Sequence, residues 1–395
     1  MARLFPFLAL ALLAAPAAQA AEPPLAAVTV VGAQQTVFRA RTGPCGPGDV
    51  PDAPARAYRD ERGEVVLFAP HYDNRPLRGP NLDRLALDCR SALASAGNPA
   101  PEAYDDRSWI TATWTSDGRH VAALVHHEYQ AHTHPGRCRY PNYMACWYNT
   151  VLGVASRDGG RSFERPKVPA VVAAAPFGQE SEQGRHRGFF NPSNIVGHGG
   201  AAYMLAATTG WAGQGGGACL FRSDDPLSPG SWRAFDGAGF TIPARDPYRA
   251  RGAARPPCRP IEPFPGSVGG VVRHRGSGAY LAVFQAKGDG DGAGKEDGGR
   301  FPESGFYATS SRDLVTWDRP RLILAGRTLY DDPCSAGPAG LISYPALIDG
   351  RAQGRNFDDV GDAADLYYVT LRVEGCTVTS DRDLVRRRVS LKVWP

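Results

Sequence analysis

The sequence predicts an all-β protein with the architecture of a five-bladed β-propeller, on the basis of three observations. The 395 residues include 46 Gly and 34 Pro, which is typical of many short strands joined by tight turns. A turn motif recurs along the chain, and five strand–turn–strand units follow one another. Blades arranged around a channel account for all three features, with a six-bladed propeller or a long β-sandwich as alternative folds.

The recurring motif joins a serine, an aspartate shortly after it and a closing aromatic residue. Its three copies are Ser156–Phe163, Ser223–Trp232 and Ser311–Trp317. Each copy follows a run of strand-forming residues. We expect the aspartate carboxylate to accept backbone N–H bonds within a tight turn and the aromatic ring to anchor the next strand in the core.

Five predicted hairpins supply the inner strands of the blades. They span residues 57–68, 109–125, 193–205, 267–284 and 343–371, and residues 384–393 form a closing strand. The connecting segments are rich in Gly and Pro. One of them, residues 288–299, contains a D-x-D-G pattern that resembles a calcium loop, but no flanking helices accompany it, so a mobile loop is the preferred interpretation.

The N-terminus predicts export. A basic start, an apolar run too short to cross a bilayer and an A-x-A pattern indicate a signal peptide over residues 1–20, cleaved near Ala20, followed by one propeller domain over residues 21–395. All eight cysteines lie beyond this segment, which favours disulfides and a secreted or periplasmic location. Cys138 and Cys146 are the easiest local pair.

Charge and composition exclude several classes of partner. The net charge is only +4 and no concentrated basic stripe is present, so nucleic acid is not an expected ligand. No second long apolar run follows the signal, so the mature chain should have no membrane span, and we expect a monomer. No sequence pattern calls for a cofactor.

Residues that start the innermost strand of each blade should face the axial funnel. There the chain offers carboxylates, which glycoside hydrolysis requires in pairs. The candidate catalytic residues are Asp52, Asp106, Glu128 and Glu262. The candidate substrate-binding residues are Arg56, Arg107, His127, Tyr129, His132, Asn191 and Tyr344.

The densest polar cluster, residues 126–134, has three open interpretations. Its imidazoles and Glu128 suit a divalent metal, its rings and polar groups suit a sugar, and it also fits a structural loop before Cys138. Because the H-E-x-x-H spacing is absent, metal is the weakest of the three, and no metal ligands are assigned.

Two copies of the turn motif carry a resemblance to known families. Ser156–Phe163 resembles the Asp-box of sialidases, and Ser311–Trp317 is similar to the blade endings of five-bladed glycosidases of the arabinanase and invertase type. This resemblance implies a base or nucleophile at Asp52 and an orienting acid at Asp106. The third position is Asn191, which cannot donate a proton as an acid, so that role falls to Glu128 or Glu262.

The expected function is therefore that of an exported, glycoside-hydrolase-like propeller acting on a glycan through paired carboxylates. The alternative is a non-catalytic propeller that binds a glycan or an envelope protein. A metal-dependent hydrolase that uses the histidines of residues 126–134 is a third possibility.

Overall fold

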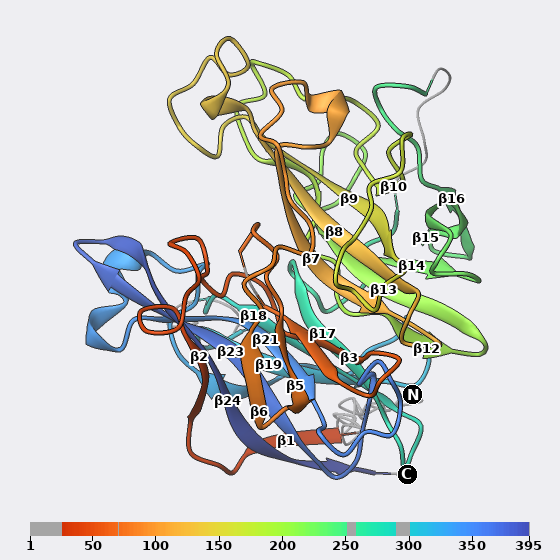
Figure 1. Cartoon of the computed structure of the whole chain (residues 1–395), viewed down its shortest axis with the longest axis vertical. Helices are drawn as coiled ribbons and strands as arrows, with labels where there is room; N and C mark the ends of the chain where they lie inside the picture. Colours follow the sequence, from red (N-terminus) through yellow and green to blue (C-terminus); the bar gives the residue numbers. More distant parts are fainter. Residues whose placement is uncertain (1–25, 70, 251–257, 290–300, 395) are drawn as a thin grey trace, which may run out of the picture.

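The computed structural model describes residues 26–69, 71–250, 258–289 and 301–394, and the strands fall into successive blades (Figure 1). The predicted signal peptide and most of the predicted loop over residues 288–299 lie outside the described residues. The described chain is nearly all β, with five short 3₁₀ helices. These helices are η1 (Pro101–Ala103), η2 (Ala131–Thr133), η3 (Pro229–Ser231), η4 (Pro333–Ser335) and η5 (Gly337–Ala339).

The first three blades follow one another in chain order, and a short parallel strand pairing joins the second and third into one ten-stranded sheet. The first contains β3 (Arg56–Arg59), β4 (Val65–Phe68), β5 (Leu77–Asn81) and β6 (Arg84–Leu87). The second contains β7 (Arg107–Trp114), β8 (Val121–Gln130), β9 (Trp147–Ser156) and β10 (Val171–Ala173). The third contains β11 (Arg187–Phe190), β12 (Val196–His198), β13 (Ala201–Thr208), β14 (Gly217–Ser223), β15 (Arg233–Phe235) and β16 (Phe240–Pro243).

The last two blades complete the set of five. The fourth contains β17 (Val268–His274), β18 (Tyr280–Ala286), β19 (Gly305–Ser311) and β20 (Arg321–Ala325), with β22 (Asp359–Val360) at its edge. The fifth contains β21 (Leu341–Ile348), β23 (Ala363–Glu374) and β24 (Thr377–Val393), joined by β1 (Ala26–Val30) and β2 (Gln35–Arg39). Strand β1 pairs antiparallel with β24, so the first and last described strands share one sheet.

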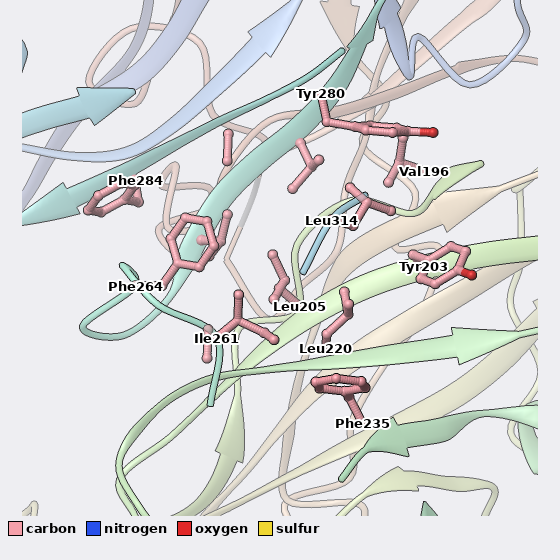
Figure 2. Close-up of a cluster of buried hydrophobic side chains, with 14 of the residues drawn as sticks. Val196, Tyr203, Leu205, Leu220, Phe235, Ile261, Phe264, Tyr280, Phe284 and Leu314 are labelled. Atoms are coloured by element: carbon pink, nitrogen blue, oxygen red, sulfur yellow. The ribbon is translucent and has the colours of Figure 1, made fainter. Parts of the chain in front are cut away.

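Five apolar clusters lie between successive blades and close the ring. Each draws residues from two neighbouring sheets, and the fifth joins the last blade to the first. Representative pairs, from the first–second to the fifth–first interface, are Phe68 with Ile110, Leu124 with Met204, Leu205 with Phe284, Val283 with Tyr368, and Tyr367 with Leu67. Figure 2 shows the third of these clusters, where side chains of the third and fourth blades interdigitate. The predicted five-bladed propeller is thus confirmed.

Strand β4 shows how a sequence builds such a ring. Its four residues are all buried, so the sequence reads as a continuous apolar run. Val66 and Phe68 pack against the second blade, whereas Val65 and Leu67 pack against the fifth. Because successive side chains of a strand point to opposite faces, an inner strand with a blade on each side must be apolar at every position. Each such side chain contributes about 1.5–3 kcal/mol by leaving water.

The recurring turn has the predicted geometry. The Asp158 carboxylate accepts the backbone N–H groups of Arg161 and Ser162, both at 3.0 Å, and Phe163 is buried between the first two blades. Asp313 accepts the N–H groups of Val315 and Thr316 in the same way, at 2.9 and 2.7 Å.

All eight cysteines form disulfides. The pairs are Cys45–Cys89, Cys138–Cys146, Cys219–Cys258 and Cys334–Cys376. The predicted pairing of Cys138 with Cys146 is confirmed. Four disulfides indicate folding in an oxidising compartment. Among the described residues, no helix has the length and apolar character needed to cross a bilayer.

Candidate functional site

A cavity of about 700 Å³ opens where the five blades meet. Every blade or its adjoining loop contributes to the wall. The polar and charged wall residues include Asp52, His71, Arg107, His126, Glu128, Gln130, His186, Asn191, Ser267, Gln285, Tyr344 and Arg382. Convergent polar groups in a concave site of this size are typical of small-molecule binding and catalysis.

Asp52 is held in the wall by the fifth blade. Its Oδ1 accepts a hydrogen bond of 3.1 Å from the Tyr344 hydroxyl and pairs with the guanidinium of Arg382. Its Oδ2 lies 3.6 Å from Nε2 of His71. Burial lowers the pKa of His71, and the negative charge of Asp52 opposes that shift. Arg382 therefore supplies the positive charge that compensates this carboxylate.

Glu128 lies near the end of β8 in the second blade. Its Oε2 accepts a 2.8 Å hydrogen bond from Nε2 of Gln130, and its Oε1 lies 3.0 Å from Nε2 of His126. The side chain is only 10% exposed. Gln130 is fixed in turn, because its Oε1 accepts a 2.6 Å bond from Arg107.

The negative charges of Asp52 and Glu128 shift the pKa values of the same neighbouring residues. Burial raises the pKa of Tyr344 well above its ordinary value, and the negative charges of both carboxylates add to the rise. Both charges likewise oppose the lowering of the pKa of His71. The two carboxylates come from different blades and face one space.

Strand β8 alternates between the cavity and the blade interior. His126, Glu128 and Gln130 line the cavity, whereas His127 and Tyr129 point away from it, as the period of a strand requires. Nε2 of His127 accepts the backbone N–H of Asp106 at 3.3 Å, and burial lowers the pKa of its ring to about 3. Tyr129 donates its hydroxyl hydrogen to the carbonyl of Pro99 at 2.7 Å.

The third blade closes the site with an amide and imidazole network. Nδ1 of His126 accepts the backbone N–H of Asn191 at 3.0 Å, and the side chain of Asn149 lies 2.6 Å from Nε2 of His126. His186 contacts the same Asn149 amide. Gly188 of β11 lies against Asn149 of β9, and only glycine fits there. A Cβ at this position would lie 2.0 Å from the carbonyl oxygen of Asn149, and the φ of Gly188 is +112°.

Two cavity residues have left-handed backbones. Asn191 and Tyr344 have φ values of +45° and +60°; asparagine adopts this conformation more often than other non-glycine residues, whereas for the bulky Tyr344 it is strained. Such strain persists only where the surrounding structure over-determines it, and it concentrates at functional sites.

Aromatic rings form much of the remaining wall. His186 stacks on Trp147 with a centroid distance of 4.4 Å, and Tyr143 lies 5.2 Å from the same indole. Burial lowers the pKa of His186 to about 3, so this stack is uncharged at neutral pH. Tyr143 and Tyr330 are 45% and 41% exposed and line the cavity. Flat apolar faces beside polar groups suit the mixed surface of a sugar ring.

Of the candidates from the sequence, the structure brings together Asp52, Arg107, Glu128, Asn191 and Tyr344. Asp106 lies behind the wall, where its Oδ2 accepts the backbone N–H of Gln130 at 2.8 Å and lies 3.1 Å from Nε2 of His134.

The remaining candidates lie away from the cavity wall. Glu262 is exposed in the turn at Pro263. Arg56 is buried and donates from Nε to the carbonyl of Thr111 at 2.6 Å, and burial lowers its pKa to about 9. His132 meets the ring of Tyr143 edge-on but does not line the cavity.

The sequence did not single out several wall residues. They are His71, Gln130, Trp147, His186, Phe190, Tyr330 and Arg382. For Gln130 a signal was available, since it shares the strand face of Glu128. The others come from loops or from distant blades, and only the closed ring brings them together.

A second depression of about 720 Å³ lies among the turns of the third and fourth blades. Its acids are engaged elsewhere: Asp224 pairs with Arg222 at 2.6 Å, and Asp225 accepts the backbone N–H of Leu227. Among the described residues, no group of three or more His, Cys, Asp or Glu side chains is arranged to hold a metal ion. The interpretation of residues 126–134 as a metal site therefore finds no support in the described chain.

No protein-family model matches the chain, and no curated protein matches it. Several solved structures are similar to it at low sequence identity. A family 117 glycoside hydrolase of Zobellia galactanivorans has 12% identity and a TM-score of 0.48 over 92% of this chain and 90% of its own. The Cellvibrio cellulosa α-L-arabinanase has 12% identity and a TM-score of 0.45, over 88% and 94%. An N-acetylgalactosamine deacetylase from F. plautii has 12% identity and a TM-score of 0.46, over 93% and 96%. The sheets and the five apolar clusters between them define the fold of this chain.

Proposed function

We propose that the chain is a glycoside hydrolase that cleaves a glycan in the central cavity, with Asp52 and Glu128 as the reacting carboxylates. One observation carries the proposal: two carboxylates from different blades face the same cavity, which aromatic rings line. Glycoside hydrolysis requires two such groups on opposite sides of the scissile bond.

The surroundings of Asp52 and Glu128 suggest a different catalytic role for each carboxylate. Asp52 is paired with the cationic Arg382, so it serves as the carboxylate that activates water or attacks the anomeric carbon. Glu128 has little exposure, with the amide of Gln130 at one oxygen and the imidazole of His126 at the other, and it serves as the acid that protonates the leaving oxygen. Asp106 acts as a positioning residue, because it holds the backbone of Gln130.

A non-catalytic glycan-binding propeller is the second candidate. It is favoured by the partners of the two carboxylates: both oxygens of Glu128 and Oδ1 of Asp52 already have hydrogen-bonding neighbours. Asn191 favours the same candidate. The resemblance to five-bladed glycosidases implies an acid at this position, and an amide cannot protonate a leaving oxygen.

Hydrolysis of a polysaccharide panel distinguishes the two candidates. The release of reducing ends would be measured for the wild type, Asp52→Asn and Glu128→Gln, with Glu61→Gln as an exposed control in the first blade. We expect each cavity variant to lose about 100-fold to 10,000-fold in rate while the control keeps its activity. Glycan binding without turnover in all four proteins would support the binding propeller.

We also propose that the chain is exported and acts as a monomer outside the cytoplasm. The predicted signal peptide and the four disulfides support export. N-terminal sequencing of the exported protein should begin at Ala21, and light scattering should give the mass of one chain. Recovery of the intact N-terminus, or the mass of a dimer, would contradict the respective proposal.

A further inference from the structure

We propose that the glycan bound in the central cavity carries an acidic substituent, a carboxylate or a sulfate, and that Arg107 binds it. This inference rests on the proposed function and narrows its substrate class. Arg107 is the first residue of β7 and lines the cavity.

Arg107 lies directly across the strand pair from Glu128. Residues opposed in this way have Cβ atoms about 4.5–5.5 Å apart, close enough for an ion pair. The side chains nevertheless stay separate, because the amide of Gln130 lies between them. Gln130 accepts a hydrogen bond from Nη1 of Arg107 at 2.6 Å and donates one to Oε2 of Glu128 at 2.8 Å.

The guanidinium of Arg107 thus has unused donors. Within the described part of the chain it forms no ion pair, and its contacts are the Gln130 oxygen and the ring of Tyr72, 5.6 Å away. A guanidinium carries five N–H donors in a planar fork that matches a carboxylate or sulfate. A guanidinium in a cavity wall with donors to spare can form charge-assisted, bidentate hydrogen bonds with an anionic ligand group.

The other basic groups of the wall are already engaged or neutral. Nε2 of His126 lies 3.0 Å from Oε1 of Glu128. Arg382, the second guanidinium, is paired with Asp52. Burial lowers the pKa values of His71 and His186, so these rings are neutral near pH 7 and do not bind an anion as cations. An anionic substituent entering the cavity therefore meets its accessible positive charge at Arg107.

The position of Gln130 between Arg107 and Glu128 also suits the proposed role of Glu128 as an acid. A direct contact between Arg107 and Glu128 would stabilise the carboxylate form and oppose the role of Glu128 as an acid. With Gln130 in place, Arg107 stays free for the substrate. Charges of both signs act on Tyr143. Partial burial and the negative charges of Glu128 and Asp52 raise its pKa, and the positive charge of Arg107 opposes the rise. A substituent on Arg107 thus lies beside the reacting carboxylates.

Matched glycan pairs test this inference. Binding to immobilised homogalacturonan and its fully methyl-esterified form, and to a sulfated galactan and its desulfated form, would be measured with Asp52→Asn to prevent turnover. The same measurements would be made in that background with Arg107→Gln, Arg107→Lys and the exposed control Arg139→Gln, which is outside the cavity wall. Thermal unfolding would establish that each variant is folded.

We expect at least one acidic glycan to bind more tightly than its neutral partner. Arg107→Gln should weaken that binding by about 10-fold to 100-fold, with Arg107→Lys in between and Arg139→Gln unchanged. The homogalacturonan pair reports on a carboxylate and the galactan pair on a sulfate. Equal binding of acidic and neutral partners, or an unchanged affinity in Arg107→Gln, would overturn the inference. The proposed function would survive if neutral glycans were still hydrolysed, whereas no binding to any member together with no turnover would remove both.

Discussion

Mild acidification is expected to destabilise the propeller through the buried imidazole of His127. The ring is 1% exposed, its Nε2 accepts the backbone N–H of Asp106, and its Nδ1 has no partner among the described residues. A proton on Nε2 would face that N–H group. Burial, aided by the positive charge of Arg165, lowers the pKa of the ring to about 3.

The sign and size of the effect follow from proton linkage. As the pH falls below the ordinary histidine value of about 6.5, the unfolded chain binds a proton that the folded chain refuses. The stabilisation present above that value is lost progressively toward the folded pKa. Between about pH 7.5 and pH 5.5 this one group should lower the free energy of unfolding by about 1.4 kcal/mol.

Urea unfolding at the two pH values measures this effect. His127→Gln keeps an acceptor for the Asp106 N–H but cannot titrate, so its loss of stability on acidification should be smaller than that of the wild type by about 1.4 kcal/mol. Thr150→Val is the matched control, because Thr150 is buried directly opposite His127 and is neutral. Thr150→Val should change the free energy of unfolding by the same amount at both pH values. If His127→Gln and the wild type lose the same free energy, then His127 is not held neutral by burial and the reasoning fails.

Three further predictions concern the framework. Trp232→Ala should cost about 3–5 kcal/mol in urea unfolding, because this fully buried indole ends one of the recurring turns, and a loss below about 1 kcal/mol would contradict that role. Replacing Cys45 and Cys89 by serine should lower the free energy of unfolding by about 4 kcal/mol, and replacing Cys138 and Cys146 by about 2.5 kcal/mol. The first disulfide closes a loop of 44 residues and the second a loop of 8, and the entropy of loop closure grows with loop length. Calorimetry that shows the reverse order would refute the entropic argument. Asp158→Ala should cost about 1–3 kcal/mol by leaving two turn N–H groups without their acceptor, and an unchanged midpoint would show that water replaces it.

The architecture could be predicted because inner strands carry a strong local signal. The apolar run of β4 and the Ser–Asp–aromatic turns require no knowledge of distant residues. The pairing of β1 with β24 could not be read in this way, since it joins the first and last described strands across the whole chain.

The site was predictable only where strand position decides which way a side chain points. Asp52 and Glu128 fall at blade ends, and both reach the cavity. The same rule misplaces Glu262, because β17 begins at Val268 and the neighbouring wall position is Ser267. Asp106 immediately precedes Arg107 and, by strand alternation, points away when Arg107 faces the cavity.

Other features depend on tertiary packing alone. The left-handed backbone of Tyr344 has no sequence signature, whereas asparagine, as at Asn191, adopts this conformation more often than most residues. The stack of His186 on Trp147 joins the residue just before β11 to the first residue of β9, and the pairing of Arg382 with Asp52 joins residues 330 positions apart. The first contact requires the second and third blades to meet, and the second requires the fifth blade to meet the first.

The most direct test of the central claim is the rate of glycan hydrolysis by the wild type, Asp52→Asn, Glu128→Gln and the double variant. If the two carboxylates act on one bond, each single variant should lose about 100-fold to 10,000-fold, and the double variant should be little slower than the worse single. Folding would be checked by circular dichroism and thermal unfolding. Full activity in either folded single variant, or losses that simply multiply in the double variant, would contradict a shared reaction at Asp52 and Glu128.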